Sequence, residues 1–113
     1  MIETLVWEEN LSLENIGEFE LAIKRLLKEN SPGIILNIRN VSYMNDQALG
    51  IIANAVKEAK EKNKEFVIIN NQATLKVIFE IVRFYSFVQV FSHEFEAHNF
   101  LEEVFSSSSR IVV

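Results

Sequence analysis

Three polar side chains, Asn45, Asp46 and Gln47, stand together where a run of β-type apolar residues gives way to a helical pattern. A carboxylate there could act as a general acid or base, could accept a phosphoryl group, or could bond the free N–H groups at a helix start. Acid–base chemistry needs a second titratable group, and the sequence offers Asp46 no obvious partner. A phosphoacceptor aspartate needs paired acidic residues after an early strand to hold magnesium, and the sequence lacks them. Enzymatic roles for Asp46 are therefore poorly supported.

Other residue types that carry chemistry are sparse. The chain has three glycines, too scattered for a phosphate-binding loop, and no GxSxG nucleophile motif. Its two histidines, His93 and His98, are five residues apart and do not share a helical face, which argues against a metal site. The chain has no cysteine, so disulfides and thiol catalysis are excluded. We predict a protein that is not an enzyme and that has no metal and no cofactor.

The composition indicates a single domain whose partner is a protein or a small molecule. The chain has 113 residues, 49% of them hydrophobic, which suits one core. The most apolar stretch, residues 77–91, is interrupted by polar and charged side chains, so we expect no membrane span. The start of the chain lacks the pattern of a signal peptide, and we expect a cytoplasmic protein. A net charge of −5 disfavours nucleic acid as a partner.

The predicted elements place the polar trio at the edge of a sheet. Short β-type runs alternate with helical patterns along the chain, in the order β-α-β-α-β-α-β-α; the runs cover residues 4–7, 33–38, 66–69 and 87–91. Alternation of this kind predicts a single α/β domain, a mostly parallel sheet of four to five strands with helices packed against it. Sites in such sheets gather at the carboxyl ends of the strands, where Asp46 falls. We assign residues 1–105 to the domain and the Ser-rich residues 106–113 to a tail, whose last three residues are a frayed end or an edge strand.

Several helix starts can be predicted from capping residues. Asn15 with Glu18 three residues later resembles a capping box, and Ser92 is a candidate cap of the last helix. At the second helix, the simplest structural role for Asp46 is that of a cap or first-turn residue, which contributes about 1 kcal/mol.

The third helical segment is apolar nearly all round. A stripe of Leu75, Ile78, Phe79 and Val82 is accompanied by further apolar side chains at Val77, Ile81, Phe84 and Tyr85. Such a helix is either deeply buried or offers an apolar patch to a partner.

Residues 33–70, GIILNIRNVSYMNDQALGIIANAVKEAKEKNKEFVIIN, resemble the central stretch of STAS domains, in particular of bacterial anti-sigma factor antagonists. That family has an apolar strand, a polar turn, and Asp-Ser-x-Gly-Leu-Gly opening a helix. The matching positions here are Asn37, Val41, Ser42, Tyr43, Met44, Leu49 and Gly50. The likeness extends from Leu5 to Val104, although only one strand, rather than the family's usual two, fits before the first helix.

The resemblance implies partner switching. In the family, the unphosphorylated antagonist binds an anti-sigma factor, often a serine kinase, and phosphorylation of the motif serine abolishes binding. Here Asn45 falls on the family's Asp, Asp46 on the phosphorylated serine and Ala48 on the Gly. A carboxylate of charge about −1 therefore stands where phosphoserine would carry about −1.5 to −2. Asp46 is then either a fixed, partial mimic of the phosphorylated state or only a cap; Ser42 precedes the helix and could be an unrelated acceptor.

The resemblance thus implies a non-enzymatic interaction module whose partner is an anti-sigma factor or serine kinase-like protein. The partner-binding residues it suggests are Tyr43, Met44, Asn45, Asp46, Gln47, Phe84 and Tyr85. Two alternatives are a STAS-like domain that senses a small molecule and a structural subunit of a larger regulatory assembly, held, for example as a homodimer, through the third helix.

Overall fold

The computed structural model describes residues 1–108 and is built around one parallel sheet. Four strands lie in sequence order across it: β1 (Ile2–Val6), β2 (Gly33–Asn37), β3 (Glu65–Ile69) and β4 (Gln89–Phe91). The connecting and closing helices are α1 (Ile16–Lys28), α2 (Asp46–Glu61), α3 (Ala73–Ile81), the short 3₁₀ helix η1 (Phe84–Ser86) and α4 (Glu94–Ser108). The alternating α/β order and the parallel sheet predicted from the sequence are confirmed, with four strands and one strand before α1.

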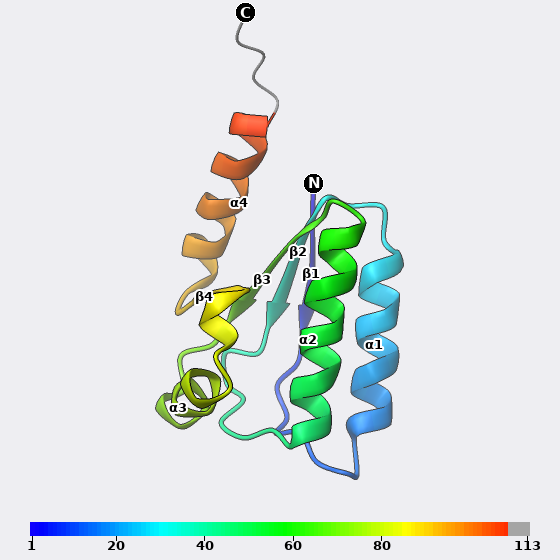
Figure 1. Ribbon diagram of the computed structural model, residues 1–113, viewed down its shortest axis with the longest axis vertical. Helices are drawn as coiled ribbons and strands as arrows, with labels where there is room; N and C mark the ends of the chain where they lie inside the picture. The colour runs from blue at the N-terminus through cyan, green and yellow to red at the C-terminus, as the bar shows by residue number, and fades with distance from the viewer. Residues whose placement is uncertain (109–113) are drawn as a thin grey trace, which may run out of the picture.

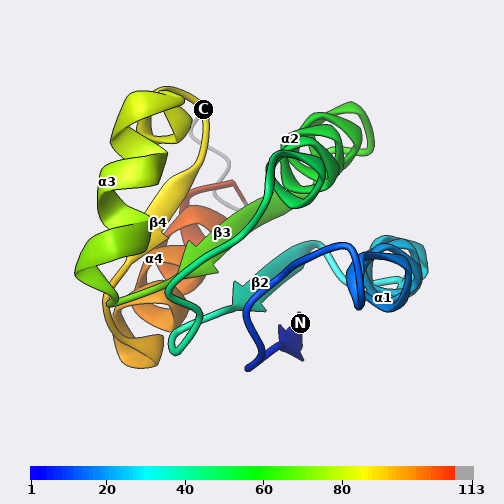
Figure 2. The ribbon, with the colours of Figure 1, turned by 90° about the horizontal axis from the view of Figure 1, so that it is seen from below.

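The helices form two layers on opposite faces of the sheet. Helices α1 and α2 cover one face, and α4 lies against the other (Figures 1 and 2). The larger core contains residues of α1, α2, α3 and η1, together with Ile34 and Leu36 of β2. A smaller core joins Ile35 to Ala97 and Leu101 of α4. Strand β2 is buried on both faces, which explains why its sequence is an unbroken apolar run.

Helix α4 depends on a glycine in β2. A Cβ built at Gly33 would lie 2.9 Å from Cζ of Phe105, so only glycine lets this ring lie against the strand. Helix α4 continues to Ser108, so the Ser-rich segment begins inside this helix. The expected edge strand at residues 111–113 lies outside the described part of the chain.

The capping of two helices differs from the sequence prediction, although α1 does begin directly after Asn15. The side chain of Asn15 makes no cap bond to α1; its Oδ1 accepts from the N–H of Ser12 and its Nδ2 donates to the carbonyl of Asn10. Asn15 therefore stabilises the preceding loop, and the capping box with Glu18 is wrong. Helix α4 begins at Glu94, so His93 directly precedes it in place of Ser92, and the His93 N–H donates to Oε1 of Glu96.

Candidate functional site

The segment between β2 and α2, residues 38–45, follows the carboxyl end of a central strand. Its first half is fixed by Asn70, which follows β3 and is only 7% exposed. Nδ2 of Asn70 donates to the carbonyls of Ile38 (2.7 Å) and Val41 (2.9 Å). Oδ1 of Asn70 accepts from the N–H of Gln72 at 3.0 Å. One buried amide thus ties the segment to the start of α3 without leaving a polar atom unpaired.

The second half of the segment is held by the loop before α1. Oδ1 of Asn10 accepts from the N–H groups of Ser42 (2.9 Å) and Tyr43 (3.3 Å), and Nδ2 of Asn10 donates to Oγ of Ser42 (3.2 Å). Next to it, Leu11 and Met44 form an isolated parallel bridge. The N–H of Leu11 donates to the carbonyl of Tyr43, and the N–H of Asn45 donates to that of Leu11.

A third contact comes from α3. Oγ1 of Thr74, in the first turn of this helix, donates to the carbonyl of Ser42 at 2.8 Å. Residues 38–45 are therefore held by side chains from two loops and one helix. A backbone bonded in this way presents its exposed side chains in one arrangement, so little conformational entropy remains to be lost on binding.

Asn45, not Asp46, caps α2. The side chain of Asn45 accepts from the N–H of Ala48 at 2.9 Å, and Asp46 is the first residue of the helix. The Asp46 carboxylate is exposed and forms no hydrogen bond or ion pair with any residue in the described part of the chain. Its charge lies favourably at the positive end of the helix. Of the two structural roles predicted for Asp46, the cap belongs to its neighbour and the first-turn position is confirmed. The carboxylate itself is free to meet another molecule.

The exposed residues of the turn border a shallow hollow, which we call the switch hollow. It is lined by Ser12, Leu13, Glu14, Tyr43, Asn45, Asp46 and Gln47. Leu13 is 80% exposed and Tyr43 is 52% exposed, so the hollow combines large apolar side chains with the carboxylates of Glu14 and Asp46. The sequence analysis did not identify Leu13. The feature that could have indicated it is an apolar side chain between two polar ones, Ser12 and Glu14, before the apolar stripe of α1 begins.

Two residues predicted to bind a partner have buried side chains, so this structure does not offer them on its surface. Met44 is 2% exposed because the bridge to Leu11 turns it into the core. Phe84 is 4% exposed and stacks on Phe79, with 4.9 Å between the ring centroids. Its burial follows from Arg83, whose left-handed backbone (φ 62°) ends α3 and turns the next residue inward. The remaining predicted residues of the turn and Tyr85 are at least partly exposed.

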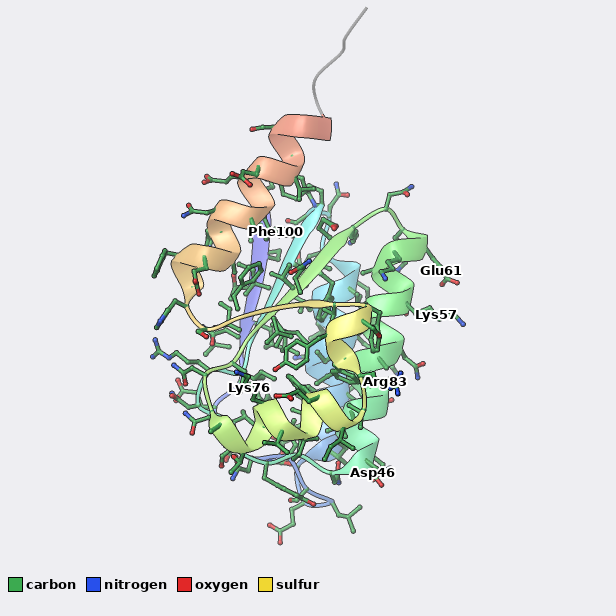
Figure 3. All side chains as sticks on the ribbon, turned by 60° about the vertical axis from the view of Figure 1, so that its left-hand side comes forward. Asp46, Lys57, Glu61, Lys76, Arg83 and Phe100 are labelled. Atoms are coloured by element: carbon green, nitrogen blue, oxygen red, sulfur yellow. The ribbon has the colours of Figure 1, made fainter. Side chains whose placement is uncertain are left out.

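Helix α3 has both buried and exposed apolar side chains. Leu75 and Phe79 face the core, whereas Val77 (55% exposed) and Ile81 (74%) are exposed. Val82 (39%) and Tyr85 (43%), which follow the helix, are exposed as well, and we call these four residues the α3 patch. Burial raises the pKa of the Tyr85 hydroxyl, and the nearby charge of Glu80 raises it further. Figure 3 shows Lys76 and Arg83 on this part of the molecule and Asp46 at the beginning of α2.

Together, these features define a single α/β domain in which a parallel sheet positions a well-bonded turn and an exposed, partly apolar hollow at the carboxyl end of a central strand. The STAS domain family model matches residues 4–97, and the chain belongs to this family. No curated protein matches the chain significantly. Among residues 1–108, no helix is both long enough and apolar enough to span a membrane.

Solved structures of antagonists share this fold. The chain is similar to an anti-sigma factor antagonist from Mycobacterium paratuberculosis, with a TM-score of 0.79 and 10% identity over 87% of this chain and 83% of the other. It is similar to the Thermotoga maritima protein TM1081, with a TM-score of 0.79 and 18% identity over 87% and 85% of the two chains. The unphosphorylated form of the anti-sigma factor antagonist SpoIIAA gives a TM-score of 0.63 and 13% identity over 96% and 91%.

Proposed function

We propose that this domain binds an anti-sigma factor of the serine-kinase type through the switch hollow, and that Asp46 supplies a permanent negative charge there. The observation that carries this proposal is the free, exposed carboxylate at the first position of α2, beside a cap that Asn45 already provides. A residue needed only for capping would be hydrogen-bonded to the backbone. Because such partners act on transcription factors, we infer a cytoplasmic place of action.

The charge of Asp46 makes it a partial mimic of a phosphoserine. A carboxylate carries about −1 and two acceptor oxygens, against about −1.5 to −2 and three oxygens for the phosphate. A partner surface that rejects a phosphate at this position will also disfavour the carboxylate, but less strongly. We therefore expect the native domain to bind an anti-sigma factor, but more weakly than an uncharged variant at position 46 would.

The domain is not regulated by phosphorylation at the usual position. Asp46 has no hydroxyl to accept a phosphoryl group as serine does. The nearest serine in sequence, Ser42, has its hydroxyl in contact with Asn10 and precedes the helix. We propose that the domain itself catalyses no reaction and that its output is set by which partner it binds.

Binding calorimetry tests the proposal. Each anti-sigma serine kinase encoded in the source genome is titrated with the native domain and with Asp46→Ser. The matched control is Glu61→Ser, which removes the same charge near the other end of α2, where Figure 3 places it. We expect Asp46→Ser to bind at least one kinase about tenfold more tightly, as removal of one unfavourable charge permits. Failure of both the native domain and Asp46→Ser to bind any kinase would overturn the proposal.

A second candidate function is that of a structural subunit in a regulatory assembly. The observation that favours it is the α3 patch, whose exposed side chains are larger and more apolar than a solvated helix face needs. The substitution Ile81→Lys places a charge at the most exposed position of the patch and leaves the core unchanged. If the patch holds a neighbouring subunit, this variant will leave the assembly, while its affinity for the kinase stays the same.

A further inference from the structure

Strand β1 forms one edge of the sheet and, in the described part of the chain, pairs only with β2. The N–H of Trp7 donates to the carbonyl of Asn37, and the N–H of Gly33 donates to that of Met1. Since alternate residues of a parallel strand bond to the same neighbour, the odd-numbered residues of β1 face β2. The N–H and C=O groups of Ile2, Thr4 and Val6 therefore point away from the sheet, along its open edge.

Apart from the charged Glu3, this edge lacks the features that usually protect a strand from pairing. Its register with β2 is regular from Ile2 to Val6, without a bulge, and the segment contains no proline and no lysine. The opposite edge, β4, is only three residues long. The side chain of Val6 is 54% exposed and that of Thr4 is exposed, on the face where Ile2 packs beside α4. Figure 2 shows α4 beneath β3 and β4; of the outward-bonding residues of β1, Ile2 packs against the α4 core, whereas Thr4 and Val6 are exposed.

We propose that β1 pairs with β1 of a second copy of this chain, antiparallel, about a two-fold axis at Thr4. The outward-facing residues then form hydrogen-bonded pairs: Thr4 opposite Thr4 of the other copy, and Ile2 opposite Val6. The exposed Val6 gains an apolar neighbour, Ile2 of the other copy, on the face of the sheet that carries α4. On the other face Glu3 lies opposite Leu5, so no two like charges meet.

The occupant is a second copy because the strand is self-complementary. On either side of Thr4, the next residue that bonds outward is β-branched: Ile2 in one direction and Val6 in the other. A two-fold axis at Thr4 therefore pairs the free backbone groups of both copies at once. The pairing also leaves the switch hollow free, because the hollow lies beyond the carboxyl end of β1. Dimerisation and kinase binding are therefore separate properties, and failure of one does not imply failure of the other.

Analytical ultracentrifugation of Thr4→Lys, Thr4→Glu and their mixture tests the pairing. We expect the native chain to form a concentration-dependent dimer. Either variant alone places like charges opposite each other on the axis and should weaken the dimer by more than about 100-fold. An equimolar mixture should recover the dimer, because Lys then lies opposite Glu. The matched control Ile81→Lys adds the same charge to the α3 patch and should dimerise as the native chain does.

A cross-link gives a second, independent readout. The chain has no cysteine, so Thr4→Cys introduces a single thiol. Opposed residues of a hydrogen-bonded antiparallel pair have Cα atoms about 5.5 Å apart, within disulfide range. We expect Thr4→Cys, but not Ile81→Cys, to form a covalent dimer under mild oxidation. A native chain that stays monomeric at all concentrations, a mixture that does not recover, or a dimer lost only in Ile81→Lys would each overturn the proposal.

Discussion

At the scale of single residues, Asn45 and Asp46 divide between them what the sequence assigned to one residue. Asn45 stabilises α2 through its bond to the N–H of Ala48, whereas Asp46 contributes charge to the surface. Sequence alone could not separate these roles, because either residue is a good cap and helix boundaries inferred from sequence are uncertain by a residue or two.

The division of roles predicts different costs in folding free energy. Asn45→Ala removes the cap and should lower the free energy of unfolding by about 1 kcal/mol. Asp46→Ala removes only a favourable charge at the helix start and should cost about 0.3–1 kcal/mol at low salt, and less at high salt. Urea titration at two salt concentrations measures both. A larger loss for Asp46→Ala at high salt would assign the cap to Asp46.

Burial of neighbouring residues predicts a second contrast. Phe84→Ala empties a fully packed ring site and should cost about 3–5 kcal/mol of stability. Tyr85→Ala, one residue on and 43% exposed, should cost far less, roughly 1 kcal/mol or below. Thermal unfolding of the two variants checks this, and similar losses in both would show that Phe84 is not a core residue.

At the scale of elements, the turn before α2 owes its shape to residues that are distant in sequence. Asn10, Asn70 and Thr74 all bond to its backbone, and none of them lies in residues 45–50, which fall on the family's Asp-Ser-x-Gly-Leu-Gly motif. A single sequence does not indicate such long-range polar contacts, because an asparagine in a loop reads only as a turn residue. This explains why the position of the turn could be predicted but not what holds it.

The hydrogen bonds by which Asn10 holds the turn can be tested directly. Asn10→Ala leaves the N–H groups of Ser42 and Tyr43 without their acceptor, so their amide hydrogens should exchange faster with solvent. The site is exposed, so the loss of stability should be no more than about 1 kcal/mol. Hydrogen exchange followed residue by residue measures this, with Asn54→Ala, on an exposed part of α2, as the control. Unchanged protection at both amides would show that Asn10 does not hold the turn.

Two glycines in different elements should respond oppositely to alanine. Gly33→Ala brings a Cβ within 2.9 Å of the Phe105 ring and should cost about 1–3 kcal/mol by overpacking β2 against α4. Gly50→Ala adds a methyl group to an exposed position of α2 with nothing within 4 Å, and should stabilise the domain by up to about 1 kcal/mol. Chemical denaturation of both variants compares them. Stabilisation by Gly33→Ala would mean that α4 does not pack closely on β2.

At the scale of the whole molecule, the sequence was sufficient for the architecture. Strand-type apolar runs alternate along the chain with helical apolar patterns, and this alternation predicts a parallel α/β sheet. The unbroken apolar run of β2 identifies a strand that is buried on both faces. Which side of α3 is exposed could not be predicted, since the left-handed Arg83 interrupts the helical period just before Phe84. The hollow itself was not predicted. Four of its lining residues, Tyr43 and residues 45–47, had been named from the sequence as partner-binding candidates, whereas Leu13 reaches it only through the folding of the loop before α1.

The measurement that most directly tests the central proposal is the affinity of one anti-sigma serine kinase for the native domain, Asp46→Asn and Asp46→Ser. Both variants remove the charge, Asp46→Asn with almost no change of shape, and Asn45 continues to cap α2 in each. We expect both to bind about tenfold more tightly than the native domain. Their stability should fall by no more than the roughly 0.3–1 kcal/mol that the charge at the helix start contributes. Equal or weaker binding of the two uncharged variants would contradict the role of Asp46 as a permanent mimic of the phosphorylated state.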